Sequence, residues 1–382
     1  MVKRLLFSIL FLSAIVKSQD LPVDEIQATI NGYFDNFGVN ILYPAVSINK
    51  NIGEKTNFNA RYMVDVISAA SIKSWFKVDG VTSATKGIHG GGDDSPDEIR
   101  HEFTAGLTHL FGDISLSLNG IYSTEHDYTS KTLAGSISIP FAKKNTILNF
   151  GVVRSWDIVA PQTRFWEKEK NVLSLSADLT QVLSTRLVMQ GTLYYSKNDG
   201  FLSDAYQVVP TLFRASVLYH EPIHPGTRER KAAGLRGSYL LNDVSSIQLG
   251  YRYYTDSWDI NSHTINILYQ RYLTGDITGS FGIRHYTQSK SFFFKEKYLV
   301  PEPLMTVDGK LNEGTTNEFE FKIAFKGESL IDVPVLNNFA GNNSELSFKL
   351  NFFWRKTATP DWHSRRLSLF AYITSIGYRF KF

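Results

Sequence analysis

The sequence of 382 residues contains no cysteine, which excludes a disulfide framework, a thiol site and a lipid anchor attached through cysteine. It also lacks any run of the roughly 20 consecutive apolar residues that a membrane-spanning helix needs. Segments with helical periodicity are almost absent, as are the G-x-S-x-G, H-E-x-x-H and phosphate-loop motifs. These absences argue against a helical membrane protein and against the commonest hydrolases.

The chain also lacks an excess of charge of one sign. Lys3 and Arg4 precede an apolar run from Leu5 to Val16, and this layout is typical of a secretory signal peptide. We expect cleavage near Ser18-Gln19, with residues 1–18 as the leader and residues 19–382 as a single domain. Removing the leader, which includes Lys17, takes three from the 40 basic residues and leaves 37 against 37 acidic residues. A near-neutral chain argues against nucleic acid as a partner.

Aromatic residues are abundant, with 27 Phe and 19 Tyr, although only 43% of the chain is hydrophobic. Apolar and polar residues alternate with a period of two, as in strands with one apolar face. In Glu318 to Lys326, for example, Phe319 and Phe321 share one face. The pattern predicts about 16 strands, with a range of 14 to 18. They are residues 25–34, 39–50, 57–65, 100–110, 114–122, 131–141, 145–157, 171–183, 186–197, 231–241, 244–256, 262–273, 277–290, 318–326, 346–355 and 367–382.

The last of these strands carries the clearest signal. Phe382, Phe380 and Tyr378 begin an aromatic and apolar face, whereas Lys381 and Arg379 begin a polar or small one. Ending on an aromatic residue resembles the terminal signal of bacterial outer-membrane barrels. We therefore predict an all-β fold, a transmembrane antiparallel up-and-down β-barrel in the outer membrane of a Gram-negative bacterium. The alternative is a soluble β-sandwich or propeller, since alternation alone does not distinguish lipid from a packed core.

The connections alternate between tight turns and long loops. In outer-membrane barrels the short turns are periplasmic and the long loops extracellular, so both termini are expected in the periplasm. The connection from Gly327 to Ser344 is too long for a tight turn, which suggests a misplaced strand boundary there. The long outer loops are expected at residues 67–97, 158–170, 198–230 and 291–317.

Charged residues gather where the strands reach the outer end. Counting along the pleat places many of them on the inward face, which predicts a mixed charge cluster inside the outer mouth. Such charges can pair with one another and hold the loops, set a field that selects solutes, or form a binding or catalytic pocket. The predicted cluster comprises Asp65, Arg100, Glu102, Glu125, Asp127, Asp157, Asp204, Arg252, Asp256 and Arg284.

One outer loop contains a separate acidic segment. Asp93, Asp94, Asp97 and Glu98 follow three glycines, and carboxylate oxygens are the ligands that Ca²⁺ prefers. The spacing does not fit an EF-hand, so a solvated loop is the alternative to a Ca²⁺ site. No other cofactor is expected.

A catalytic interpretation rests on Glu125-His126-Asp127, which places a base between two carboxylates. Neighbours in a strand point to opposite faces, so His126 is expected to face away from both acids. His263 and His285 near the same rim are too scattered to indicate a metal site. We therefore predict a protein that is not an enzyme, with a rim hydrolase as the alternative.

Several of these polar segments resemble the family of unknown function numbered 3570. They are residues 65–71, 81–85, 122–128, 200–204, 251–258, 262–264 and 284–289, which occur in order along nearly the whole chain after the leader. The insertion from Gly90 to Asp97 departs from the family. The resemblance implies a bacterial envelope protein and no particular activity. It also implies small lipoproteins, with flavin-transfer or thioredoxin-like proteins, as associates in an envelope redox or metal-handling system.

Two functional hypotheses follow. The first is a porin-like channel for small solutes, because a barrel of about 16 strands can enclose an aqueous lumen. The second is a surface scaffold or receptor whose long loops bind a ligand or a partner such as an envelope lipoprotein. Both place the barrel wall in outer-membrane lipid.

Overall fold

The computed structural model describes residues 21–36, 38–69, 98–162, 164–213, 216–331, 333–358 and 368–382. The predicted signal peptide and most of the predicted acidic loop, including Asp93, Asp94 and Asp97, lie outside these residues. Within them, no helix is long and apolar enough to cross a membrane.

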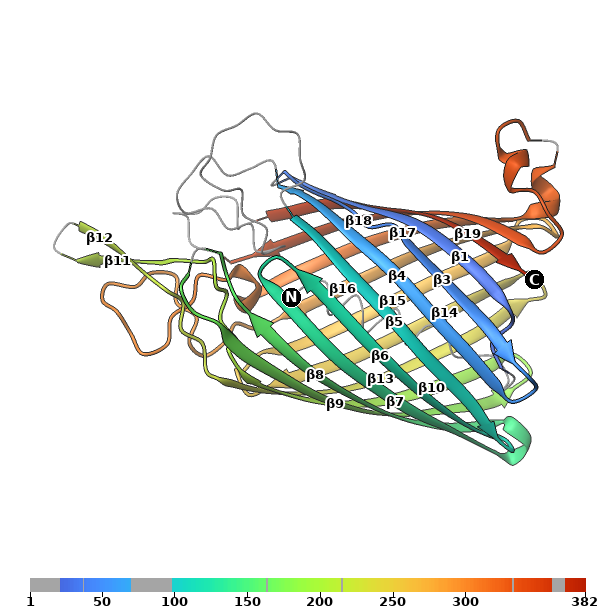
Figure 1. The fold of residues 1–382 in the computed structure, drawn as a ribbon, viewed down its shortest axis with the longest axis horizontal. Helices are drawn as coiled ribbons and strands as arrows, with labels where there is room; N and C mark the ends of the chain where they lie inside the picture. The colour runs from blue at the N-terminus through green and yellow to red at the C-terminus, as the bar shows by residue number, and fades with distance from the viewer. Residues whose placement is uncertain are drawn as a thin grey trace.

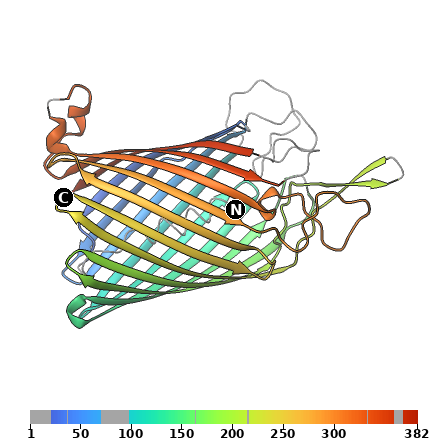
Figure 2. The ribbon, with the colours of Figure 1, turned by 180° about the vertical axis from the view of Figure 1, so that it is seen from behind.

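The strands form a closed antiparallel barrel (Figures 1 and 2). Its 17 strand segments make 16 staves, because β2 and β3 follow one another along β1 and β4. This confirms the predicted fold class and strand number. The segments are β1 (Glu25–Asp35), β2 (Val39–Leu42), β3 (Ala45–Ile52), β4 (Thr56–Ala69), β5 (Glu98–Phe111), β6 (Ile114–Glu125), β7 (Tyr128–Phe141), β8 (Thr146–Val159), β9 (Lys168–Ser184), β10 (Leu187–Gly200), β13 (Thr227–Asn242), β14 (Ser245–Asp256), β15 (Asn261–Tyr272), β16 (Ile277–Gln288), β17 (Gly314–Lys326), β18 (Ser344–Thr357) and β19 (Ser368–Lys381).

The break between β2 and β3 has a local cause. Pro44 has no N–H and cannot donate to the ladder, although its carbonyl still accepts a hydrogen bond from the Val64 amide at 3.1 Å. Tyr43 donates to the Asn31 carbonyl at 2.9 Å, so the strand continues past the proline.

The barrel closes between its first and last strands. β1 pairs with β19 along its full length, from Glu25 opposite Lys381 to Asp35 opposite Ala371. The Phe382 amide then donates to the Asp24 carbonyl at 3.1 Å. Closure leaves no free sheet edge, which is the condition for a sheet to cross a bilayer.

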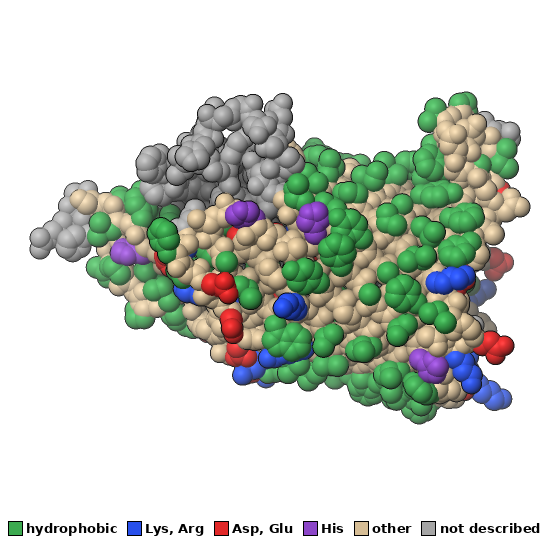
Figure 3. Space-filling model, viewed as in Figure 1, with side chains coloured by type: hydrophobic (Ala, Val, Ile, Leu, Met, Phe, Trp, Pro, Cys, Tyr) green, Lys and Arg blue, Asp and Glu red, His purple; other side chains and the backbone are tan. Residues whose placement is uncertain are grey.

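Alternation along each strand separates two environments. On β1, Ile26, Ile30 and Phe34 point outward and are 42%, 58% and 37% exposed. On β4, Asn57 and Asp65 point inward and are 1% and 3% exposed. Figure 3 shows the outward apolar side chains spread over the barrel wall. The molecule is therefore apolar outside and polar inside, as a lipid-embedded barrel requires.

The two ends of the barrel differ. Short connections close one end, where Gly112 adopts φ +64° in the turn between β5 and β6 and η1 (Ala142–Lys144) joins β7 to β8. The predicted exception, residues 327–343, lies at this end and contains η3 (Gly327–Leu330) and η4 (Leu336–Phe339). β17 ends at Lys326 and β18 begins at Ser344, so the suspected boundary error was wrong: the connection is simply longer.

The opposite end carries the long loops. Residues 201–226 contain the hairpin of β11 (Val209–Phe213) and β12 (Ser216–His220), which projects beyond the barrel (Figure 1). Residues 289–313 contain η2 (Gly309–Leu311). The two loops are joined by backbone hydrogen bonds between Ile223 and Met305, both at 2.9 Å. Together they form one folded unit, which we call the cap.

Candidate functional site

The inner surface carries carboxylates on one side of the barrel, which we call the acidic wall. Its members all lie on inward-facing positions of β4 to β9. Their basic partners, Arg61, Arg100 and Lys170, are fewer. The acidic wall comprises Asp65, Glu102, Glu125, Asp157 and Asp178.

Within the acidic wall the carboxylates are held by close neighbours. The Arg100 guanidinium donates from Nε and Nη2 to the two carboxylate oxygens of Glu125, at 2.9 and 2.8 Å. Arg61 Nη1 lies 3.5 Å from Glu102 Oε1. Bidentate pairing fixes both side chains more firmly than a single contact, so this part of the wall is rigid.

The next carboxylate along the wall is Asp157 of β8, whose side chain is fully buried. Ser130 Oγ donates to its Oδ1 at 2.6 Å, and Lys170 Nζ lies 3.6 Å from its Oδ2. The three residues lie on the adjacent strands β7, β8 and β9. Strand pairing alone therefore brings this cluster together.

A second group of charges lies on inward-facing positions of β13, β14 and β16, and we call it the arginine wall. In a barrel of 16 staves, β14 lies eight staves from β4, so Asp65 and Arg252 lie on opposite sides of the lumen, whereas β9 and β13 are separated only by β10. Arg236 donates to Gln190 at 2.5 Å, and Arg284 Nη1 lies 3.6 Å from Glu318 Oε2. The arginine wall comprises Arg228, Arg230, Arg236, Arg252 and Arg284.

Two members of the arginine wall form no ion pair, although Asp256 lies opposite one of them, Arg230, in the strand register. Arg230 Nε is buried without a hydrogen-bond partner, and no ion pair among the described residues includes Arg230 or Arg252. Unpaired guanidinium groups on a wall raise the local concentration of anions. The two walls therefore create a field across the lumen.

Asp256 joins the arginine wall to the cap. Its Oδ2 accepts from Arg228 Nε at 2.8 Å and from the Tyr254 hydroxyl at 2.6 Å. Its Oδ1 accepts from the backbone amides of Trp258 and Ile260, at 2.9 and 3.1 Å. Arg228 in turn lies 4.2 Å from the centroid of the Trp258 ring. One carboxylate thus organises the whole turn from β14 to β15.

The cap has a small apolar core of its own. Trp258, which is 1% exposed, packs with residues of both long loops, including Leu202, Phe293 and Leu311. A second cluster joins Val209, Tyr298, Met305 and Val307. Because burial of apolar surface stabilises this unit, the cap is a folded element rather than a pair of independent loops.

His224 lies at the centre of the cap. Its Nδ1 donates to the Leu202 carbonyl at 3.1 Å, so Nε2 accepts from the Thr306 hydroxyl at 2.9 Å. The ring also contacts Trp258, with ring centroids 5.5 Å apart. Burial lowers the pKa of His224 below its ordinary value of 6.5, because the charged ring would lose its hydration.

The cap also reaches over the acidic wall. The Tyr206 hydroxyl donates to the Asp127 carboxylate, and it accepts from the Gln162 amide at 3.2 Å. Asp204 does not line the lumen: its Oδ1 accepts from the amides of Tyr206 and Gln207, at 2.9 and 3.3 Å, and forms a turn. The predicted cluster is therefore divided among the acidic wall, the arginine wall and the cap.

Sequence reasoning missed several partners for a simple reason. Arg228 and Arg230 belong to β13, which begins at Thr227, four residues before the predicted start at Lys231. Alternation of Arg228, Arg230 and Ala232 on one face was the available signal. Lys170 ended a predicted loop and Glu318 began a predicted strand, and neither was connected to its partner, Asp157 or Arg284.

The remaining predicted site residues are only partly described by the structure. His126 is exposed on the turn between β6 and β7, whereas Glu125 binds Arg100 and Asp127 is buried. Glu98 begins β5, and the other three residues of the predicted Ca²⁺ loop lie outside the described residues. Among the described residues, no group of three or more His, Asp or Glu residues is arranged to hold a metal ion.

Several charged inward-facing side chains remain accessible at different heights in the barrel, although others, such as Asp65 and Asp157, are buried. The exposed fraction is 28% for Arg284, which lies nearer the cap, and 32% for Arg61, which lies in the middle part of β4. It is 35% for both Lys349 and Arg379, which lie nearer the short turns. Side chains filling a closed core would be almost fully buried, so the interior is solvated.

Residues 13–326 match the family described as "Protein of unknown function (DUF3570)". The chain belongs to this family. The resemblance inferred from the polar segments is thereby confirmed, although the match ends near the end of β17. No curated protein matches the chain.

Among solved structures, the chain is similar to a bacterial polysaccharide outer membrane secretin. The two are 8% identical with a TM-score of 0.54, over 96% of this chain and 100% of that one. The outer membrane protein OmpTdeltaL8 of Vibrio cholerae is 8% identical with a TM-score of 0.43, over 94% and 99%, which is too distant to carry an argument. This member of the DUF3570 family is therefore a β-barrel with the fold of outer-membrane proteins.

Proposed function

We propose that this DUF3570 protein is a channel of the bacterial outer membrane for small polar solutes. The observation that carries the proposal is the accessibility of charged inward-facing side chains at both ends of the barrel. A solvated, charge-lined interior is the arrangement found in conducting barrels, in contrast to smaller barrels filled by side chains.

The two charged walls supply the selectivity. Asp65 on β4 and Arg252 on β14 face each other from opposite sides of the barrel. A solute that carries both an acidic and a basic or hydroxyl group can orient in such a field, with its anionic end toward the arginine wall. This favours zwitterionic or anionic solutes over simple cations.

The proposed location follows from the same barrel. Residues 1–18 act as a signal peptide cleaved near Ser18-Gln19, residues 19–382 form the barrel, and the cap faces the outside. This orientation is supported by the short connections at one end and the long loops at the other. Extraction from the outer membrane only by detergent, with heat-modifiable gel mobility, is the expected result. Release by carbonate would contradict the location.

Conductance of the purified barrel in planar bilayers tests the channel. We expect step-like conductance, with the folded state of each sample verified by heat-modifiable mobility. A correctly folded barrel that stays silent would contradict the channel.

A second candidate function, a scaffold or receptor, is favoured by the β11–β12 hairpin. Leu212, Val217, Leu218 and Tyr219 of this hairpin are 54%, 49%, 45% and 48% exposed. Exposed apolar side chains on a projecting hairpin suit a protein partner, and the family resemblance implies an envelope lipoprotein. Replacing residues 205–222 by a short Gly-Ser linker separates the two functions. A silent barrel that conducts after this replacement would favour a receptor closed by its cap.

A further inference from the structure

The lipid-facing wall of the barrel contains a hollow of about 970 Å³ across β3 to β8. Its floor is a row of small outward-facing residues, Ala60, Ala105 and Gly120, which are direct neighbours on β4, β5 and β6. In the space-filling view, tan atoms of the backbone and of uncharged polar side chains lie between the apolar side chains of this face (Figure 3). A volume of this size is in the range of ligand sites.

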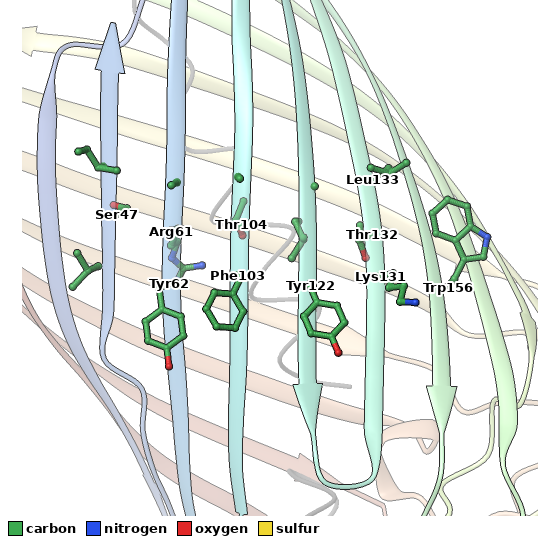
Figure 4. A pocket seen from close by; sticks show the side chains of 16 residues that line it. Ser47, Arg61, Tyr62, Phe103, Thr104, Tyr122, Lys131, Thr132, Leu133 and Trp156 are labelled. Carbon is green, nitrogen blue, oxygen red and sulfur yellow. The ribbon is translucent and has the colours of Figure 1, made fainter. Parts of the chain in front are cut away.

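Larger side chains border the hollow on the side of the cap. The next row toward the outer end consists of Tyr62, Phe103, Tyr122, Lys131 and Trp156, paired from strand to strand. Figure 4 shows these five side chains side by side above the turn that joins β6 to β7. Aromatic rows of this kind mark the interface between lipid tails and headgroups, so the hollow begins just below headgroup level.

The row also carries charge that the protein leaves uncompensated. Lys131 is exposed, and Arg154 on the neighbouring strand lies 5.7 Å from the centroid of the Trp156 ring. Lys131 pairs with Trp156 and Leu133 with Arg154, so the two cations are diagonal neighbours, roughly 7–8 Å apart at Cα. No described residue forms an ion pair with either.

A lipid-facing cation costs free energy that grows with its depth in the bilayer. Two such cations side by side also repel each other. A phosphate group held between them would remove both penalties, since guanidinium and ammonium groups bind phosphate through charge-assisted hydrogen bonds. An acyl chain of the same molecule would then lie in the hollow below.

We propose that this hollow binds one phosphate-bearing lipid of the outer leaflet. The phosphate contacts Lys131 and Arg154, and an acyl chain covers Ala60, Ala105 and Gly120. The site is independent of the lumen and of the proposed channel.

The glycine in the floor permits a sharp test. A Cβ added to Gly120 meets nothing within 4 Å, so Gly120→Leu fills the hollow without a clash. Gly191, on β10, also faces the lipid with nothing within 4 Å of an added Cβ, but lies outside the hollow. Gly191→Leu is therefore its matched control. For the charges, the test is Lys131→Gln with Arg154→Gln, and Lys322→Gln on the inward face of β17 is the control.

The measurement is native mass spectrometry of the detergent-solubilised barrel titrated with diphosphorylated lipid A. A second hollow of about 870 Å³ borders Lys231, so the readout counts bound molecules. For Gly120→Leu and for the double charge variant, we expect the affinity of this hollow for lipid to fall about tenfold. Each variant should therefore bind one lipid fewer than the unmodified barrel at the same lipid concentration. Both controls should keep it.

Two further probes identify what is recognised. Lipid A without phosphates is expected to lose the same adduct, and millimolar inorganic phosphate alone should not displace the intact lipid. Unchanged binding in either test variant, or equal binding of the dephosphorylated lipid, would overturn the proposal. Displacement by inorganic phosphate would also overturn it, because it would reveal a simple ion site. Heat-modifiable mobility verifies that each variant is folded.

Discussion

At the scale of single residues, hydrogen bonds of buried polar side chains hold the outer mouth of the barrel together. Asp256 accepts hydrogen bonds from the Arg228 guanidinium, from the Tyr254 hydroxyl and from two backbone amides. Its side chain is fully buried. Removing one partner of a buried pair leaves the other charge uncompensated, which costs more than the pair itself contributes.

We therefore expect Asp256→Ala to lower the free energy of unfolding by about 3 kcal/mol. Denaturant titration of the refolded barrel measures this change. Asp113→Ala is the control, because Asp113 is exposed and its contact with Lys144 is 4.0 Å long; surface pairs contribute little. Equal effects of the two substitutions would contradict a central role for Asp256.

His224 makes the cap sensitive to pH. Its pKa in the folded cap is lowered by burial, so an opened cap binds the proton more tightly than the closed one. His224 contributes fully to the stability of the closed cap above its ordinary pKa of 6.5, and this contribution is lost as the pH falls below that value. Asp308, Asp204 and Arg228 face the ring and modify the pKa in opposing directions.

Acidification from pH 7.5 to pH 5 is therefore expected to lower the protection factors of the cap amides against hydrogen exchange several-fold, where each exchange rate is divided into the intrinsic rate at the same pH. The barrel amides should change little. In His224→Gln, which retains a polar side chain without a titrating ring, the difference between the two pH values should disappear. A pH response that survives in this variant would assign the titration to another group.

At the scale of elements, the strands follow from alternation and the turns from a few special residues. Arg252 and Asp256, which alternation places on one face of β14, pair with Gly234 and Arg230 of β13. Strand starts were less accurate: β13 begins four residues before its predicted start, since Thr227 to Arg230 are polar on both faces. Only their pairing with β10 makes them a strand.

Gly200 ends β10 in a conformation that other residues rarely adopt. Its φ is +107°, and an added Cβ would lie 2.3 Å from the Glu169 carbonyl oxygen. Gly200→Ala is expected to destabilise the barrel by about 2 kcal/mol. Gly191→Ala, in the same strand with open space around the added Cβ, should be neutral or slightly stabilising. Thermal unfolding of both variants checks this, and similar melting temperatures would argue against strain at Gly200.

At the scale of the whole molecule, charges from distant parts of the chain meet across one lumen. The acidic wall comes from β4 to β9 and the arginine wall from β13 to β16. Barrel closure places β4 and β14 on opposite sides of one interior, so both walls line the same lumen. Selectivity is therefore a property of the closed barrel rather than of any segment.

Arg252→Gln tests this field. A unit charge about 8 Å from the path of an ion in water contributes roughly 0.5 kcal/mol, a factor of about two in relative permeability. We expect the ratio of chloride to potassium permeability to fall about twofold, measured as the reversal potential across a salt gradient. Lys381→Gln, inward-facing beside the short-turn end, should change it less. An unchanged ratio of chloride to potassium permeability in Arg252→Gln would show that the arginine wall does not contribute to selectivity.

The sequence by itself determined the barrel, its strand number and the side of each strand that meets lipid, because a period of two is a local property that survives without tertiary contacts. It also placed Arg100 and Glu125 on the same inner surface. The tertiary structure decided which charges pair, that Asp204 belongs to the cap, and that His224 is buried. Such contacts join residues as far apart as Tyr206 and Asp127, or His224 and Thr306. They depend on barrel closure and loop packing, which alternation along a strand does not encode.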